Sequence, residues 1–275
     1  MPVTVEVTES ASEALELAGA FLQARPIEHN LLLTLLTDRA ARPQPGRYWI
    51  ARQDDEVAGV GFHSPLTFPP TLTPMPAEVA RAIAEAARAG GDLPGVAGEA
   101  ATAAAFAGHW AELCKVAATP VFGQRLYHLG DLRLPEGVSG RLRPARRADY
   151  PVVEAFTIAF HEFIGEHGFS PTVLMSRIEA GEMRLWEDGE PVSCAMHSAA
   201  VAGVARIQQV YTPPEKRRHG YAGACVAQLS QRLVDAGLQC VLYTDLANPT
   251  SNSVYRNLGY RAVVEAVRYR FTPGG

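Results

Sequence analysis

The stretch Thr212-Pro-Pro-Glu-Lys-Arg-Arg-His-Gly-Tyr-Ala-Gly223 is the most informative segment of this chain. It is a polar loop that follows a predicted strand, residues 205–211, and leads into residues 221–236, where apolar side chains recur at helical spacing. A strand, a basic glycine loop and a helix in this order present free backbone N–H groups at the positive end of the helix dipole. The loop is therefore predicted to hold a diphosphate group.

Glycine at position 220 favours this interpretation, because a residue without Cβ lets phosphate oxygens approach the backbone closely. The loop has neither the G-x-G-x-x-G spacing of a dinucleotide fold nor the G-x-x-x-x-G-K-[ST] pattern of a P-loop. Nicotinamide and nucleotide-triphosphate chemistry are therefore disfavoured. The alternative is an ordinary connection with a solvated basic face.

Composition sets the broad class of protein. A chain of 275 residues that is 47% hydrophobic and 20% charged can bury a core, and its length favours two modest domains. The 25 Lys and Arg residues against 29 Asp and Glu give no chain-wide cationic field, so no nucleic-acid partner is expected. No leader or membrane segment is recognisable, which predicts a cytoplasmic protein without a membrane partner. The dispersed Cys114, Cys194, Cys225 and Cys240 predict buried free thiols, with no zinc site and no disulfide framework.

A Gly/Pro/Ser-rich stretch at residues 134–141 predicts the domain boundary, giving domains 1–137 and 138–275. In the first domain a hairpin is expected, with residues 48–53 and 57–63 joined at Asp54-Asp55. In the second domain Asp149 is expected to cap a helix over residues 150–163, and strands should flank the turn at residues 187–190. Further helices are predicted at 12–24, 28–40, 76–89, 99–113 and 251–258, and further strands at 240–245 and 262–271.

Three segments resemble the GCN5-related N-acetyltransferase (GNAT) superfamily. Arg217-x-x-Gly220-x-Ala222 is similar to its Q/R-x-x-G-x-G/A acyl-CoA loop. Residues 248–260, from Asn248 through Tyr255 to a Leu-Gly-Tyr ending, resemble its strand-to-helix segment, and residues 142–149 resemble its first strand and helix cap. The resemblance implies an α/β (α+β) GNAT fold, with a mixed central sheet flanked by helices, for residues 138–275. Residues 1–137 lack these motifs and are expected to form a non-catalytic unit, either a degenerate GNAT-like α/β domain or a cap.

The resemblance also implies roles for individual residues. Tyr255 would be the general acid that protonates the departing CoA thiolate, for which an ordinary phenol is suited. The backbone of residues 210–212 would pair with the pantetheine arm, residues 217–223 would hold the pyrophosphate, and Asn248, Ser251 and Arg256 would contact the rest of CoA. The full set of implied acetyl-CoA-binding residues is Val210, Tyr211, Thr212, Arg217, Arg218, His219, Gly220, Tyr221, Ala222, Gly223, Asn248, Ser251 and Arg256. No metal is expected.

The implied activity is acetyl transfer from acetyl-CoA to a primary amine of a small molecule or protein, by direct attack on the thioester. Family members often carry a Glu on a central strand as base, whereas this chain has Gln208 and Gln209 there. The other residues considered as the base are His161, Glu162, Glu166, His167 and His197, each of which also fits a loop acid or a structural histidine. A non-catalytic acyl-CoA sensor and an adaptor protein remain alternatives, and a homodimer is left open.

Overall fold

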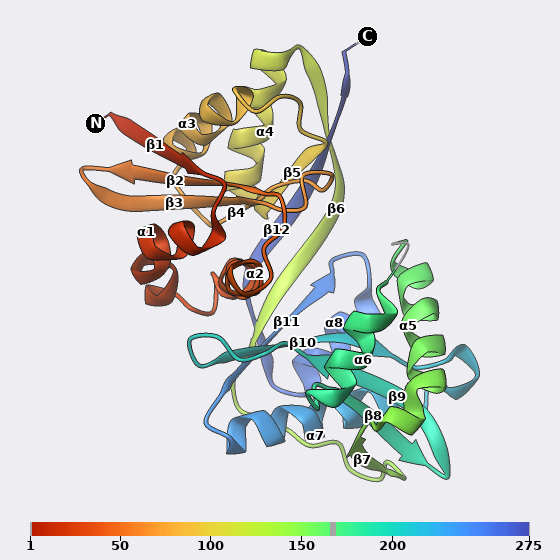
Figure 1. The fold of residues 1–275 in the computed structure, drawn as a ribbon. Coiled ribbons are helices and arrows are strands. Elements are labelled where there is room, and N and C mark those ends of the chain that lie inside the picture. The colour runs from red at the N-terminus through yellow and green to blue at the C-terminus, as the bar shows by residue number, and fades with distance from the viewer. Residues whose placement is uncertain (1, 166–168, 275) are drawn as a thin grey trace. The chain divides into compact units, whose positions relative to one another are not determined.

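The computed structural model describes residues 2–165 and 169–274, and it divides into two compact units (Figure 1). The first unit contains the described residues up to Leu126 together with residues 244–247 and those from Val263 onward. The second unit consists of Tyr127–Tyr243 and Asn248–Ala262. The chain therefore leaves the first unit near residue 126, returns to it briefly at residues 244–247 and enters it again from Val263.

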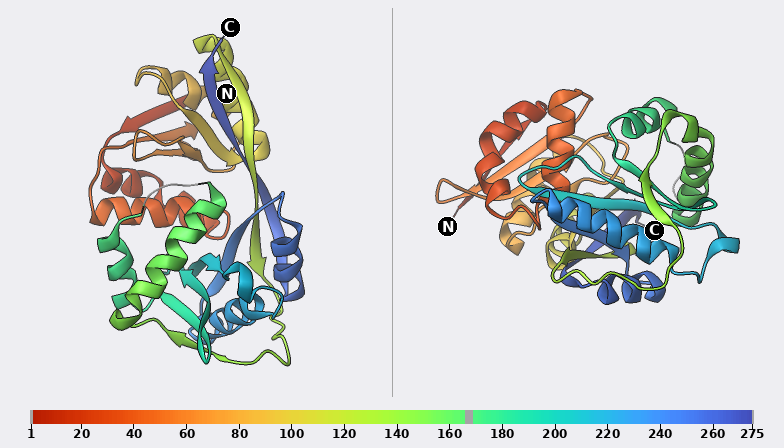
Figure 2. Two further views of the ribbon diagram at one scale, coloured as in Figure 1. Left: turned by 90° about the vertical axis from the view of Figure 1, so that its right-hand side faces the viewer. Right: turned by 90° about the horizontal axis from the view of Figure 1, so that it is seen from below.

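This division corrects the boundary predicted from composition. Residues 138–275 do not form a separate unit, because the last strand, β12 (Tyr260–Pro273), pairs antiparallel with β5 (Gly95–Glu99) of the first unit. Figures 1 and 2 show this dark blue strand running beside yellow-green segments of the first unit. The Gly/Pro/Ser-rich stretch predicted as the boundary lies inside the second unit.

The first unit is a sheet with helices on both faces. Its strand order is β1-β2-β3-β4-β5-β12. Its elements are β1 (Val3–Thr8), α1 (Ala11–Ala24), α2 (Asn30–Ala41), β2 (Arg47–Gln53), β3 (Glu56–His63), β4 (Thr71–Leu72), α3 (Ala77–Arg88), β5 and α4 (Ala100–Cys114), followed by β6 (Val116–Leu129), which contributes residues to both units. The predicted hairpin is confirmed, since Asp54 and Asp55 both adopt positive φ, as a two-residue turn between twisted strands requires.

The second unit repeats this order of elements. Its strands follow the order β11-β10-β9-β8-β7. Its elements are β7 (Arg141–Pro144), the short 3-10 helix η1 (Arg147–Asp149), α5 (Tyr150–Ile164), α6 (Pro171–Glu179), β8 (Met183–Asp188), β9 (Glu190–His197), β10 (Val204–Tyr211), the 3-10 helix η2 (Pro214–Lys216), α7 (Tyr221–Asp235), β11 (Gln239–Asp245), α8 (Pro249–Asn257) and β12. Each unit thus runs strand, two helices, three strands, helix, strand, helix, strand, as expected of two related α/β domains.

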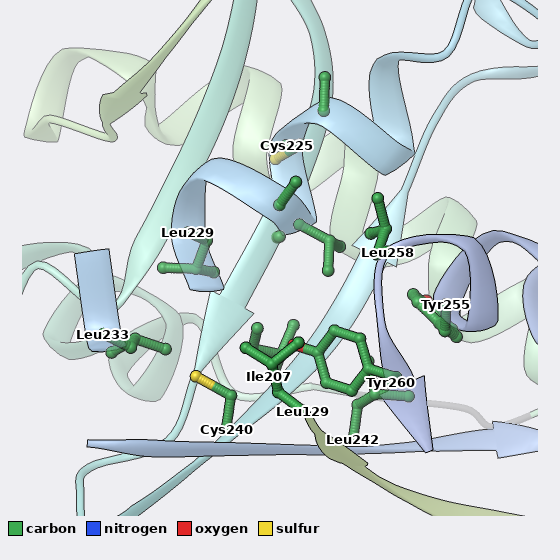
Figure 3. Packing of buried hydrophobic residues seen from close by; sticks show 14 of the residues in the cluster. Leu129, Ile207, Cys225, Leu229, Leu233, Cys240, Leu242, Tyr255, Leu258 and Tyr260 are labelled. Carbon is green, nitrogen blue, oxygen red and sulfur yellow. The ribbon is translucent and has the colours of Figure 1, made fainter. Parts of the chain in front are cut away.

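Two hydrophobic clusters cover opposite faces of the second sheet. On one face α7 and α8 pack on β10 and β11, where Leu229, Ile207 and Leu242 are almost completely buried (Figure 3). On the other face α5 and α6 pack on β8 and β9 through residues such as Phe156 and Leu185. The predicted mixed α/β architecture is therefore confirmed, with the sheet between two layers of helices.

The predicted capping role of Asp149 is wrong in its detail. Asp149 precedes α5, but its side chain makes no capping bond to that helix. Its carboxylate instead accepts from the backbone N–H of Arg146 at 2.7 Å and from the guanidinium of Arg143 at 2.7 and 2.9 Å. This arrangement joins η1 to β7 and holds the pKa of Asp149 below its usual range, chiefly through the Arg143 hydrogen bonds.

Candidate acyl-CoA site

In the second unit β10 and β11 form a parallel strand pair, and their pairing ends before their carboxyl ends. The pairing covers Val204–Ile207 opposite Gln239–Leu242 and stops there. Between Gln208 and Tyr211 the register of β10 against β9 also shifts, and Gln209 has φ +50°. A bulge of this kind redirects a strand and ends its pairing. The side of β10 that faces away from β9 is thus free of β11 beyond Ile207 among the described residues.

The bulge is held in place by side-chain contacts that the sequence did not reveal. Gln209 is 9% exposed, and its amide nitrogen donates to Oγ1 of Thr157 on α5 at 2.6 Å. The Sγ atom of Cys194 donates to the Gln209 carbonyl at 3.7 Å. A left-handed non-glycine residue is costly unless its surroundings determine it, and these contacts from α5 and β9 supply that constraint.

The strand-edge residues predicted to meet pantetheine lie at this bulge. The carbonyl of Tyr211 accepts from Oγ of Ser193 at 2.9 Å, and the same hydroxyl lies 2.9 Å from Oγ1 of Thr212. The Tyr211 ring packs on Phe156 with ring centres 5.7 Å apart. These contacts fix the end of β10, while Val210 packs at the margin of the α7 cluster.

The N-terminus of α7 has no side-chain cap. Its N-cap is Gly220 at φ +80°, and the first N–H to reach a helical acceptor is that of Ala224, which donates to the Gly220 carbonyl at 3.0 Å. Ser10 caps α1, Ser170 caps α6 and Asn248 caps α8. The amides of Tyr221, Ala222 and Gly223 thus remain available at the positive end of a 15-residue helix, which is suited to an anion.

The three cations of the loop differ in their contacts. The Lys216 ammonium lies 2.5 Å from a carboxylate oxygen of Glu190. The Arg217 side chain donates from Nε to the Thr212 carbonyl at 3.0 Å, and its guanidinium lies 5.6 Å from the centre of the Phe163 ring. Arg218 is exposed, has φ +67°, and makes no side-chain hydrogen bond or ion pair with the described residues. Among the described cations of the loop, Arg218 is therefore the one left to meet a ligand.

The prediction for Gly220 was that the missing Cβ lets phosphate approach the backbone, and the structure adds two further reasons for glycine at this position. Its positive φ favours glycine, and a Cβ there would stand 3.0 Å from Cγ2 of Val138. The rings of His219 and Tyr221, on either side of Gly220, stack with centres 5.4 Å apart. Contacts within the protein therefore determine the conformation of the loop backbone. One of them comes from Val138, which lies in the stretch predicted as the domain boundary.

The second predicted segment lies beside the first. A Cβ at Gly223 of α7 would stand 3.7 Å from Cγ1 of Val254 on α8, so the first turn of α7 lies close to the second half of α8. The Asn248 side chain accepts from the N–H of Ser251 at 3.0 Å and thus caps α8. Arg256 is exposed, and its Nε donates to the Asn252 carbonyl of its own helix at 3.2 Å. No contact between described residues joins Arg256 to the loop.

Tyr255 lies in the hydrophobic core, in the last turn of α8 (Figure 3). It is 8% exposed, and its ring packs edge-on against Tyr260 with centres 6.1 Å apart. Burial raises its pKa to about 12, with a smaller contribution from the nearby thiol of Cys225. The hydroxyl has no hydrogen-bond partner among the described residues, and it stays protonated at neutral pH.

The described residues considered as the general base do not form a cluster, and each has its own separate surroundings. The His161 ring contacts the Phe160 and Phe169 rings at 6.0 and 6.3 Å between centres. His197 lies 2.9 Å from the Ser198 carbonyl through Nδ1, and Gln208 accepts from Nε of Arg206 at 3.4 Å. The other two residues considered from this region, Glu166 and His167, lie outside the described residues, and Glu162 is exposed on the last turn of α5.

The corresponding region of the first unit is closed by its own residues. There β4 and β5 are also parallel, but a Cβ at Gly98 would stand 3.2 Å from the Leu72 carbonyl, so the strands remain in contact. The Thr102 hydroxyl of α4 bonds both the N–H and the carbonyl of Met75, at 3.0 and 3.1 Å, just before α3. The first turn of α3 carries Glu78, which disfavours an anion. This unit shares the order of elements and lacks the basic glycine loop.

Within residues 2–165 and 169–274, no helix is long and apolar enough to cross a membrane. In the same described ranges, His, Cys, Asp and Glu side chains form no cluster that could hold a metal ion.

Comparison with known proteins agrees with the fold. The family model described as FR47-like protein matches residues 194–270, which span the bulge, the basic loop and α8. No curated protein sequence matches the chain. Similar solved structures include an acetyltransferase of the GNAT family from Colwellia psychrerythraea, with TM-score 0.65 and 14% identity over 98% of this chain and 100% of that chain.

Two further structures extend the likeness over both units. A GCN5-related N-acetyltransferase from Sphaerobacter thermophilus matches with TM-score 0.61 and 14% identity, over 98% of this chain and 95% of that one. A tandem GNAT protein from the clavulanic acid biosynthesis pathway matches with TM-score 0.57 and 12% identity, over 100% and 99% of the two chains. Both units therefore share the fold of these GCN5-related N-acetyltransferase structures, and residues 194–270 are similar to the FR47-like family.

Proposed function

We propose that this protein is an acetyl-CoA-dependent N-acetyltransferase whose reaction takes place in the second unit. The observation that carries the proposal is the uncapped N-terminus of α7, which follows a basic loop at the separated ends of β10 and β11. In a sheet of this kind, ligands bind outside the carboxyl ends of parallel strands. The amides of Tyr221 to Gly223 and the side chain of Arg218 fit a pyrophosphate.

The donor supplies an activated acetyl group as a thioester. A neutral primary amine would attack the thioester carbonyl carbon, so that the C–N bond forms and the C–S bond breaks. The unpaired side of β10 beyond Ile207 offers backbone groups to the amides of the pantetheine arm. Val210 and Thr212 would direct this pairing, and Asn248 would act by fixing the start of α8 rather than by contacting the ligand.

Tyr255 would donate its phenolic proton to the thiolate as the C–S bond breaks. A pKa of about 12 keeps the proton on the phenol until charge develops on the sulfur. The same apolar surroundings raise the basicity of a thiolate formed beside it, which brings the two groups closer in proton affinity. The resulting phenolate recovers its proton from the attacking nitrogen, which must lose one proton as the amide forms.

A non-catalytic acyl-CoA sensor is the second candidate, and one observation favours it. The amide of Gln209, on the strand where a base is expected, is already bound to Thr157, and Gln208 cannot take a proton from an ammonium. A sensor would keep the phosphate site and lack amine-dependent turnover. Residues 1–137 would have no catalytic role in either case.

The two candidates are separated by measuring free thiol released from acetyl-CoA in the presence of amines. The panel should contain small primary amines and peptides with a free N-terminus or lysine. Amine-dependent release with the expected acetylated product supports the transferase. Saturable acetyl-CoA binding without release, across both classes of amine, supports the sensor.

A further inference from the structure

We propose that Asp188, at the turn between β8 and β9, is a positioning residue that holds the loop before α7 in its phosphate-binding conformation. This inference rests on the proposed function, because the loop that Asp188 would hold is the proposed pyrophosphate site. Asp188 does not belong to the loop, and none of the motifs in the sequence singles it out.

The contacts of Asp188 join three separate segments. Its Oδ2 atom accepts a hydrogen bond from the Tyr221 hydroxyl at 2.6 Å and one from the Ser139 hydroxyl at 2.6 Å. Tyr221 is the first residue of α7, and its N–H is one of the uncapped amides. A bond to the Tyr221 side chain therefore fixes the residue that begins the anion site.

Both donors favour the charged form of Asp188. The Ser139 hydroxyl contributes most, and the Tyr221 hydroxyl next, to a pKa of Asp188 below its usual range. The same contact raises the pKa of Tyr221, so its phenol remains a donor. Hydrogen bonds to an ionised acceptor are stronger than neutral ones, which suits a contact that must hold a loop at the surface.

A second acid on the same turn holds the start of the loop. Gly189 has φ +73° and makes the turn, and Glu190 beyond it lies 2.5 Å from the Lys216 ammonium. The loop is thus attached to the β8–β9 turn at Lys216 and at Tyr221. Between these attachments stand Arg218 and Gly220, both with positive φ.

The neighbouring segment supports the same arrangement. The indole nitrogen of Trp186 on β8 donates to the Ser139 carbonyl at 2.8 Å. Val138, one residue earlier, is the side chain that a Cβ at Gly220 would approach at 3.0 Å. Ser139 is therefore fixed from β8, and its own hydroxyl adds to the hold on Asp188.

An acid placed beside an anion site disfavours the ligand through its charge, so its benefit must come from geometry. Asp188→Ala removes both hydrogen bonds, whereas Asp188→Asn removes the charge and keeps an acceptor oxygen for the two hydroxyls. Tyr221→Phe removes only the bond to α7. Asp235→Asn is a matched control, because Asp235 is an exposed acid at the far end of the same helix, paired with Gln231.

The first experiment measures amide hydrogen exchange over residues 213–222 in the full chain without ligand. Exchange should be faster in Asp188→Ala than in the unaltered chain, close to normal in Asp188→Asn, and unchanged in Asp235→Asn. Unchanged exchange in Asp188→Ala would overturn the proposal even if acetyl-CoA binds. Faster exchange in a chain that binds no acetyl-CoA would support the positioning role and contradict the proposed function.

The second experiment compares acetyl-CoA with S-acetyl-pantetheine, which lacks the phosphates. Asp188→Ala should raise the KM or Kd for acetyl-CoA by about 10-fold, the size expected for one charge-assisted hydrogen bond, and leave that for S-acetyl-pantetheine unchanged. Adding Tyr221→Phe to Asp188→Ala should cause little further loss. Equal weakening of both thioesters, or additive losses in the double variant, would overturn the positioning role.

Discussion

The environment of Tyr255 determines what its hydroxyl can do. The ring is fixed by Tyr260 and the core beneath α7, and the pKa near 12 keeps the phenol in the acid form over the physiological range. A phenylalanine fills the same space, so the hydroxyl can be removed without creating a cavity. Replacing Tyr255 with Phe therefore tests the role of the hydroxyl while leaving the packing of the ring unchanged.

Tyr255→Phe should lower kcat about 100-fold or more, the range of general acid catalysis, and leave acetyl-CoA affinity nearly unchanged. Steady-state kinetics gives the first quantity and calorimetry the second. The melting temperature should stay close to that of the unaltered chain. A kcat within twofold of normal would remove Tyr255 from the proton-donating role.

Two buried histidines of the first unit predict how stability depends on pH. His29 and His63 are 0% and 3% exposed, and each has one ring nitrogen near a backbone carbonyl and the other buried without a described partner. Burial is the largest cause of a lowered pKa in both, with Arg25 lowering and Glu28 raising that of His29, and Arg47 lowering that of His63. The neutral ring is therefore the form that fits the fold.

Because the folded pKa lies below the unfolded value of about 6.5, this stabilisation is fully present above that pH and is lost as pH falls through the folded pKa. Each histidine adds a slope of at most ~1.4 kcal/mol per pH unit to the free energy of unfolding. His29→Gln and His63→Gln should each show a shallower loss of stability between pH 7.5 and 5. Denaturant unfolding across that range checks this, and unchanged slopes would contradict it.

At the residue level the sequence predicted the basic loop and Tyr255 by type and order, because glycine and aromatic residues at fixed spacing leave a visible pattern. It did not show that Arg256 bonds within its own helix. It also missed Asp188, since a hairpin-turn acid is common and its partners are distant in sequence. These contacts depend on tertiary packing.

Among the elements, the bulge of β10 links the site to α5. The amide of Gln209 reaches Thr157 only because the strand leaves its regular course at positive φ. Nothing in the local sequence marks this residue, because glutamine does not favour that conformation and the compensating contacts come from α5 and β9. Most helix positions were predictable from periodicity, whereas α6, β1 and this departure from regularity were not.

Thr157→Val should lower the free energy of unfolding by about 1–3 kcal/mol, because the variant keeps the side-chain shape but leaves the buried Gln209 amide without its acceptor. Chemical denaturation measures the change. The exposed Ser176→Ala on α6, which loses a hydroxyl bonded only to the Val173 carbonyl of its own helix, serves as a control with little expected effect. A change below 0.5 kcal/mol for Thr157→Val would show that the bulge does not depend on this bond.

For the whole molecule, the main departure from the sequence-based view is the last strand. Residues 266–270 pair with 95–99, and Phe271 stacks on Trp110 with ring centres 5.9 Å apart. Partners separated by about 170 positions in the chain leave no local signature, so a composition shift at residues 134–141 was a poor guide to the boundary. The repeated order of elements, in contrast, could be partly anticipated from helix and strand periodicity.

Ending the chain at Ala262 should destabilise the first unit by about 3 kcal/mol, through the loss of a partner strand and its half-buried aromatic residues. Its melting temperature should fall by roughly 10 °C. A chain ending at Phe271 is the control, because it keeps residues 266–270, which pair with β5, and the described residues that it loses, 272–274, are exposed. Equal melting curves for the two truncations would contradict the assignment of the strand to the first unit.

The central claim is that one of two similarly folded units retains an acyl-CoA site. Calorimetric titration of the full chain with acetyl-CoA tests it most directly. One mole of acetyl-CoA should bind per mole of chain, and Arg218→Ala should weaken the binding. Two sites per chain would contradict the closed first unit, and no saturable binding would contradict the proposed site at α7.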